Sequence, residues 1–325
     1  MLRRRDFLAA LPAPLLVGSV RESPKSVILL LLVGGPSQID TWDPKPNAPS
    51  NIRSPWKSIR TNVPGMEITE LFPRMARQAD KFTLVRSVHH DGPALHDVGH
   101  QILQTGFHSM NQSEFAHIGC LSGNHVVLPH TLGNTGSGEV PNGQNGLQPL
   151  TDFNLQSEPP KLRAQYGNTK FGRSCLMARK LVEQGTPFVT VNMYETVFGQ
   201  PTWDAHGSEP FSPLSSHRDH AAPSFDMAYS ALLQDLSSRG MLQNTLVVAT
   251  GEFGRTPRIN PVGGRDHWAH CWTAILAGGT TPAGTVYGTS DATASEPKDN
   301  PVHANRIAAS MANHLGIGLP GIAPL

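Results

Sequence analysis

The stretch that most constrains the fold is Thr245–Trp268, in which an apolar run is followed at once by polar residues set among glycines. Its first six residues, TLVVAT, predict a strand buried on both faces of a parallel sheet. Glu252, Arg255, Asp266 and His267 come after this strand. Because ligands bind at the carboxyl edge of open α/β sheets, we expect these side chains to line a site. The alternative is a strand followed by a polar surface loop.

Four further apolar runs predict strands of the same sheet, and helical patterns lie between them. The predicted strands cover residues 27–33, 82–88, 187–194 and 272–278. The predicted helices cover residues 69–80, 171–184, 224–239 and 303–314. This alternation is typical of an α/β fold with a mostly parallel central sheet and helices on both faces.

A length of 325 residues is compatible with one large α/β domain or with two smaller ones. Residues 107–160 are dominated by glycine, asparagine, serine and proline, with only a weak strand signal in HVVL. This composition predicts an irregular insert that covers the rim of the site. We therefore expect a single domain over residues 21–325 that contains this insert.

Residues 1–20 have the pattern of a twin-arginine export signal, because Arg4-Arg5-Asp6-Phe7-Leu8 precede a short apolar stretch. That stretch is too short to span a bilayer, and the later run VILLLLV predicts a buried strand. We expect a periplasmic or extracellular protein with no membrane span in the mature chain. A basic N-terminal tail without a targeting role is the alternative.

Charge and cysteine content argue against several classes of protein. Lysine and arginine number 26 against 25 aspartates and glutamates, so bulk charge does not indicate a nucleic-acid partner. The 3 cysteines lack C-x-x-C spacing, which argues against a disulfide scaffold and a cysteine-only zinc site. The 15 histidines are a large number, and imidazole is the commonest metal ligand among side chains.

Imidazole and carboxylate side chains follow several predicted strands, although they lie far apart in the sequence. A parallel sheet would bring them to one edge. Mixed ligands of this kind suit zinc, manganese or iron, and a two-ion site would stabilise displacement at phosphorus or sulfur. Arg255 has paired donors suited to a tetrahedral anion. The converging residues are Asp40, His96, Asp204, His206, Glu252 and His267.

Each of these residues also has a purely structural interpretation. Asp40 would cap its loop, His96 would lie on the surface of a helix, and Arg255 would pair with Glu252. For His267 we expect one ring nitrogen to bind metal while an acceptor holds the other, whereas the alternative is simple packing beside Trp268. Convergence of several such groups at one edge favours a site.

Five segments, in this order, resemble a bacterial family called domain of unknown function 1501, a sulfatase-like branch of the alkaline phosphatase superfamily. They are GGPSQIDTWDPKP, FTLVRSV, WDAHG, GEFGRTP and GRDHW. The resemblance implies an alkaline phosphatase-like fold that binds divalent metal, with zinc, manganese or calcium as candidates. It implies that the metal ligands are Asp40, Asp204, His206, Glu252 and His267.

The resemblance is incomplete where the superfamily's enzymes carry their nucleophile. His96 stands at the comparable place, and no activated hydroxyl or thiol is evident there. The resulting hypothesis is an exported, metal-dependent hydrolase of small-molecule or glycan esters of sulfate or phosphate, with His96 and Arg255 as catalytic residues. The alternative is a non-catalytic relative that binds metal or an anion and recognises a glycan or a protein partner.

Overall fold

The computed structural model describes residues 25–108, 115–128 and 154–325. The expected export signal over residues 1–20 lies outside these ranges. Within them, no helix combines the length and the apolar character that crossing a membrane requires.

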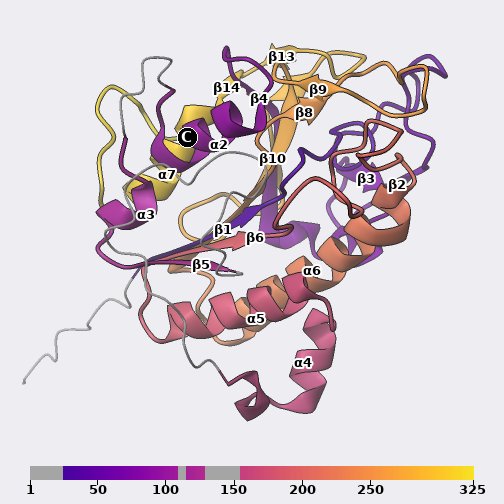
Figure 1. The fold of residues 1–325 in the computed structure, drawn as a ribbon. Helices are drawn as coiled ribbons and strands as arrows, with labels where there is room; N and C mark the ends of the chain where they lie inside the picture. The colour runs from indigo at the N-terminus through magenta and orange to yellow at the C-terminus, as the bar shows by residue number, and fades with distance from the viewer. Residues whose placement is uncertain (1–24, 109–114, 129–153) are drawn as a thin grey trace, which may run out of the picture.

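A central sheet of eight strands organises the chain (Figure 1). The strands are β1 (Ser26–Leu31), β4 (Phe82–His89), β5 (His125–Leu128), β6 (Phe188–Asn192), β7 (Thr245–Thr250), β10 (Trp272–Ala277), β11 (Thr285–Tyr287) and β14 (Val302–His303). Their order is β11-β4-β10-β7-β1-β6-β5, and β14 also pairs with β4. Only β10 runs antiparallel to its neighbours in this sheet, so the predicted mostly parallel sheet is confirmed.

Helices cover both faces of the sheet (Figure 1). On one face lie α2 (His96–Thr105), α3 (Ile118–Leu121) and α7 (Ala304–His314). On the other lie α4 (Pro160–Tyr166), α5 (Lys170–Glu183) and α6 (Ala222–Ser238), the last preceded by a π-helical turn, His217–Ala221. The helices predicted over residues 171–184, 224–239 and 303–314 correspond to α5, α6 and α7 within two residues at each end.

The helix predicted over residues 69–80 is wrong in extent. The segment contains the end of β3 (Glu67–Thr69), the single turn α1 (Pro73–Ala76) and a short 3₁₀ turn, Ala79–Lys81. The carboxylate of Asp226 on α6 accepts hydrogen bonds from the backbone N–H groups of Arg74 and Met75, at 3.0 and 2.8 Å. A tertiary contact therefore caps this turn. The weak strand signal HVVL, inside the expected insert, forms the edge strand β5.

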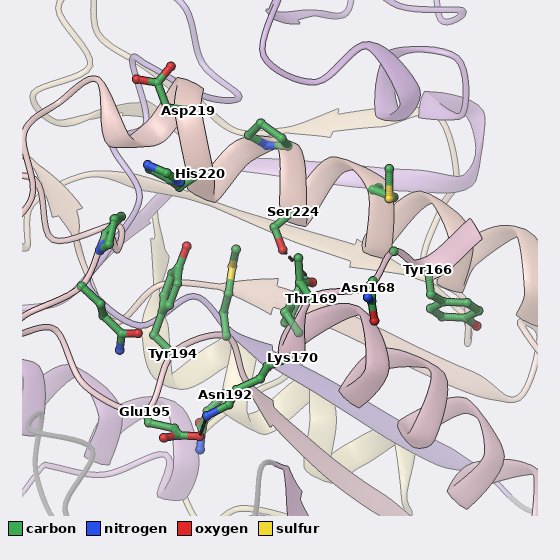
Figure 2. Close-up of a pocket in the computed structure, with 17 residues that line it drawn as sticks. Tyr166, Asn168, Thr169, Lys170, Asn192, Tyr194, Glu195, Asp219, His220 and Ser224 are labelled. Carbon is green, nitrogen blue, oxygen red and sulfur yellow. Dashed lines mark hydrogen bonds and ion pairs between the residues drawn. The ribbon is translucent and has the colours of Figure 1, made fainter. Parts of the chain in front are cut away.

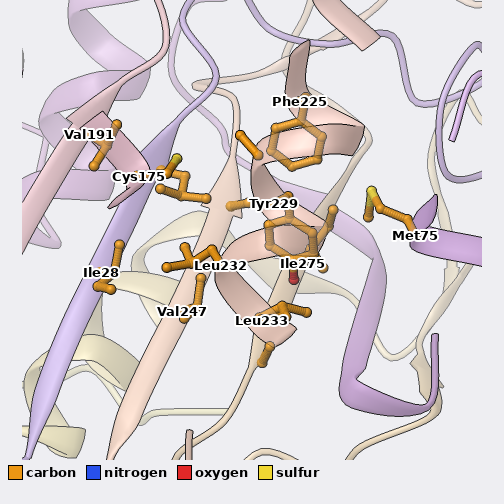
Figure 3. Close-up of a cluster of buried hydrophobic side chains, with 14 of the residues drawn as sticks. Ile28, Met75, Cys175, Val191, Phe225, Tyr229, Leu232, Leu233, Val247 and Ile275 are labelled. Carbon is orange, nitrogen blue, oxygen red and sulfur yellow. The ribbon is translucent and has the colours of Figure 1, made fainter. Parts of the chain in front are cut away.

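The hydrophobic core between α6 and the sheet explains why the central strands consist of apolar residues. Phe225, Tyr229 and Leu232 of α6 are fully buried and belong to one hydrophobic cluster with Ile28 of β1 and Val247 of β7 (Figure 3). Successive residues of a strand face opposite sides, so a sheet covered on both faces needs apolar residues at every position. All six residues of β1 and of β7 are accordingly buried.

Three two-stranded ladders lie outside the central sheet. They pair β2 (Ser58–Arg60) with β3, β8 (Gly254–Arg255) with β9 (His267–Trp268), and β12 (Thr289–Ser290) with β13 (Pro297–Asp299). The β8–β9 ladder matters most, because it places Arg255 opposite His267. These residues lie between the end of β7 and the start of β10, at the carboxyl edge of the parallel strands.

Helix α2 approaches that edge so closely that its backbone nearly touches the chain after β7. A Cβ added at Gly99 would lie 2.2 Å from the carbonyl oxygen of Glu252. No side chain larger than hydrogen fits there without moving α2 or the Glu252 backbone.

We therefore expect Gly99→Ala to lower the free energy of unfolding by about 1–3 kcal/mol through overpacking. At an open helical position the same change would stabilise the protein by about 1 kcal/mol. A decrease in the free energy of unfolding therefore indicates the close contact. Gly318→Ala is the matched control, since a Cβ there meets no atom within 4 Å. Urea unfolding followed by circular dichroism measures both, and equal stability of the two variants would contradict the close contact.

Candidate metal centre

A buried carboxylate, that of Asp204, lies at the centre of a group of imidazoles. Asp204 and His206 belong to the loop after β6, His267 lies in β9, and His96 is the first residue of α2. The Nε2 atoms of His206 and His267 are each 3.1 Å from Asp204 Oδ1. The Nε2 atom of His96 is 3.5 Å from Asp204 Oδ2. Asp204 is fully buried, whereas the three imidazoles are partly exposed.

The other ring nitrogen of two of these histidines donates to an oxygen. His267 Nδ1 lies 3.0 Å from the carbonyl oxygen of Ala94, and His206 Nδ1 lies 3.0 Å from Asp266 Oδ1. A carbonyl and a carboxylate only accept hydrogen bonds, so the proton of each neutral imidazole sits on Nδ1. The Nε2 atoms that face Asp204 are then lone-pair donors.

The two bare nitrogens also face each other. His206 Nε2 and His267 Nε2 are 3.1 Å apart, and both lie beside the same carboxylate oxygen. The Arg255 guanidinium contacts this same oxygen, but two lone pairs 3.1 Å apart still repel each other unless a cation lies between them. Imidazoles whose Nδ1 is held by a carboxylate or carbonyl are the usual arrangement of metal-binding histidines. The donor set therefore fits a divalent ion.

Glu252 contacts the Nδ1 side of His96, whose Nε2 faces Asp204. Its Oε1 accepts hydrogen bonds from His96 Nδ1 and from the backbone N–H of Gly34, the latter at 2.9 Å. Its Oε2 lies 3.5 Å from Nε2 of His100, which is also in α2. Glu252 is buried and orients His96. His100 was not predicted, although its i+4 spacing from His96 in the sequence HDVGH puts both on one helical face.

Arg255 forms a buried ion pair with Asp204. It is fully buried, and its guanidinium donates to the backbone oxygens of Gly34, Gly35 and Arg265 and to Asp204 Oδ1. These contacts engage all three of its nitrogens with groups of the protein. The binding of a substrate anion by Arg255 stays a prediction. The alternative pairing with Glu252 is not seen, because Glu252 bonds to His96.

Asp40 is also engaged by the protein. Arg265 Nε lies 2.7 Å from Asp40 Oδ2 and a terminal nitrogen of Arg265 lies 3.2 Å from Oδ1, with both side chains buried. Such a bidentate pair occupies both carboxylate oxygens. The structure thus separates Asp40 from the imidazole group to which the sequence had assigned it. Nothing in the sequence singled out Arg265 as its partner.

The electrostatics keep the centre charged. Burial alone would raise the pKa of Asp204, but the charge of Arg255 and the contacts with the three histidines hold it well below its usual range. Burial lowers the pKa of His96, yet its bonds to Asp204 and Glu252 prevail and raise that pKa to about 9. Burial lowers the pKa of His267, which favours the neutral, lone-pair form of this imidazole.

The predicted site residues thus divide into two sets. The first set lies close together and consists of His96, Asp204, His206 and His267; Glu252 contacts this set through His96. Asp40 and Arg255 instead form buried ion pairs, with Arg265 and Asp204 respectively. In the described part of the chain, no serine, threonine or cysteine side chain hydrogen-bonds to a side chain of the converging set.

Several solved structures resemble this fold. A magnesium-bound variant of TAB5 alkaline phosphatase matches 91% of the chain and 99% of its own length, with TM-score 0.50 and 14% identity. An alkaline phosphatase superfamily protein from Vibrio parahaemolyticus matches with TM-score 0.49 and 13% identity, covering 91% of this chain and 67% of its own. The PsFucS1 sulfatase from Pseudoalteromonas sp. matches with TM-score 0.45 and 14% identity, covering 90% and 68%.

No curated protein matches the chain. The sequence does match the family described as "Protein of unknown function (DUF1501)" over residues 24–129 and 143–320. That match covers most of the chain and includes every residue of the candidate metal centre. The expected family and fold are confirmed: the chain belongs to the DUF1501 family and has an alkaline phosphatase-like fold.

Proposed function

We propose that the protein is an exported, metal-dependent hydrolase of phosphate or sulfate esters whose divalent ion is held by Asp204, His206 and His267. The observation that carries the proposal is the 3.1 Å separation of the Nε2 atoms of His206 and His267 beside a buried carboxylate. One carboxylate and two imidazoles leave further coordination positions open, as in catalytic sites. Imidazole ligands favour zinc, manganese or iron over calcium, which prefers oxygen ligands throughout.

A divalent ion held here would supply Lewis-acid chemistry toward a phosphoryl or sulfuryl oxygen. The chain's own residues keep that chemistry in place. Arg255 keeps Asp204 ionised, and Asp266 and the Ala94 carbonyl fix the rings of His206 and His267. Fixing a ring in this way raises the basicity of the opposite nitrogen.

His96 is the proton donor in this proposal. Its raised pKa, about 9, keeps the imidazole protonated at neutral pH, and Glu252 holds Nδ1 so that Nε2–H points toward the ion-binding group. A proton on Nε2 could pass to the leaving-group oxygen of an ester bound beside Asp204, while a water molecule forms the new bond to phosphorus or sulfur. His96 lies at the start of α2, where the helix dipole also favours a bound anion.

The ligand assignment is tested by metal content. His267→Ala should remove one ligand and lower the bound metal from stoichiometric to trace, whereas Asp266→Ala should weaken affinity about 10- to 100-fold because His206 loses its orienting acceptor. His270→Ala, an exposed histidine in the same segment, is the matched control and should keep its metal. Elemental analysis together with melting temperature reads out all three. Full metal content in His267→Ala with only a lower melting temperature would refute the assignment.

The catalytic assignment is tested with aryl phosphate and aryl sulfate esters. Wild-type protein loaded with zinc or manganese should hydrolyse at least one of them, and chelation should abolish the activity. His96→Gln should keep the metal but lower kcat about 100-fold or more, the usual contribution of general acid catalysis. Because the protonated form is the active one, kcat should fall as pH rises through the pKa of His96, which its contact with Glu252 raises.

A non-catalytic metal-binding relative is the second candidate. The observation that favours it is the absence, among the described residues, of a hydroxyl or thiol bonded to the side chains of this centre. Stoichiometric metal without turnover of either ester class would select this candidate. Loss of metal on His96→Gln would instead make His96 a fourth ligand and remove it as the proton donor.

Export is proposed from the Arg4-Arg5-Asp6-Phe7-Leu8 sequence. Replacement of both Arg4 and Arg5 by lysine should leave the protein in the cytoplasm of the expressing cell, because the twin-arginine pathway reads the arginine pair. Cell fractionation and immunoblotting measure the distribution. Equal export of wild type and the lysine variant would exclude this route.

A further inference from the structure

A cavity lies beside α5 and α6, at the carboxyl end of β6. Its volume is about 510 Å³, within the range of about 300–1,000 Å³ that is typical of small-molecule sites. The starts of α5 and α6 and the segment after β6 surround it (Figure 2). None of the residues of the proposed metal centre lines this cavity. It is therefore a separate place where a ligand can bind.

The most informative side chain in the cavity is Asn192, the last residue of β6. It is 6% exposed, it lines the cavity, and its carboxamide makes no hydrogen bond with any residue that the structure describes (Figure 2). Because Asn192 lines the cavity, its amide can hydrogen-bond to a ligand there. An amide both donates and accepts, so a ligand that satisfies it must carry both kinds of group.

Neighbouring side chains offer the same mixture of donors and acceptors. Burial raises the pKa of Tyr194, so its phenol remains a hydroxyl. Gln200 uses its amide nitrogen on the Thr196 carbonyl at 3.0 Å, which leaves its side-chain oxygen for a ligand. Asn168 uses its oxygen to accept from Arg173 at 3.1 Å, which leaves its amide nitrogen. The polar lining is therefore largely neutral.

The charged side chains of the cavity are compensated within the protein. Lys170 lies 2.9 Å from Glu195, and Asp219 lies 2.7 Å from Arg218. An ionic ligand would find no unpaired opposite charge among these groups. The remaining lining includes the apolar side chains of Phe171, Met193 and Met227, which suit C–H surfaces.

We propose that this cavity binds an uncharged, polyhydroxylated molecule, namely a saccharide of one or two units. Hydroxyl groups both donate and accept, as the carboxamide of Asn192 requires. The C–H faces of a sugar ring match the apolar side chains, and the ion pairs of Lys170 and Asp219 fit a neutral ligand. The site does not depend on the metal centre or on its proposed chemistry.

Saturation-transfer NMR with glucose, galactose, N-acetylglucosamine and cellobiose tests the proposal on the full chain. Each sugar is used at about 10 mM, above a millimolar Kd. At least one should receive saturation from the wild-type protein. Asn192→Ala should raise its Kd about tenfold, as expected for one lost hydrogen bond to a buried group. Met227→Trp should abolish binding by filling the cavity.

Asn305→Ala, the same substitution at a residue of α7 outside the cavity, is the control and should bind like wild type. Circular dichroism checks folding, and either cavity variant suffices if the other fails to fold. The proposal is overturned if no sugar binds the wild type, or if the folded cavity variants bind as tightly as wild type. Loss of binding on chelation would also overturn it, because the sugar would then occupy the metal centre.

Discussion

The structure at the carboxyl edge depends on a single buried charge, the carboxylate of Asp204. An isolated carboxylate cannot remain ionised without water unless opposite charge surrounds it, and Arg255 supplies that charge. Arg255 in turn is held by backbone oxygens of Gly34, Gly35 and Arg265, in the segments after β1 and before β10. One ion pair therefore joins loops that follow three different strands. Removing one member of such a pair typically costs about 3–5 kcal/mol, because the other stays buried and unpaired.

Two glycines make this arrangement sterically feasible. A Cβ on Gly34 would lie 2.5 Å from the backbone nitrogen of Asp204, and one on Gly35 would lie 2.7 Å from the ring of Phe253. Both have positive φ, at 106° and 69°. The turn after β1 therefore exposes its carbonyls to Arg255 only because it lacks side chains. The sequence GGPS thus serves the site through its backbone.

Much of the fold was predictable from sequence, because buried strands and amphipathic helices leave clear periodic patterns. The same holds for His96, Asp204, His206 and His267, since residues that flank strands at one edge must gather there. What could not be predicted was the partner of each charge. Asp40 and Asp204 look alike in the sequence, yet one meets Arg265 and the other meets imidazoles. Such choices depend on side-chain packing between distant segments, 225 residues apart for Asp40 and Arg265, which local patterns do not encode.

The reversed direction of β10 has a consequence for how this edge is built. A parallel strand after β7 would need a crossover that carries the chain from the carboxyl ends of the strands back to their amino ends. Because β10 runs antiparallel to β7, the chain never leaves the carboxyl edge between Thr250 and Trp272. The segment is thus a loop anchored at both ends in the sheet, with Glu252 near its entry and His267 near its exit. Lengthening the exposed tip around Val262 would enlarge the rim of the candidate site at little entropic cost, while Glu252 and His267 kept their positions.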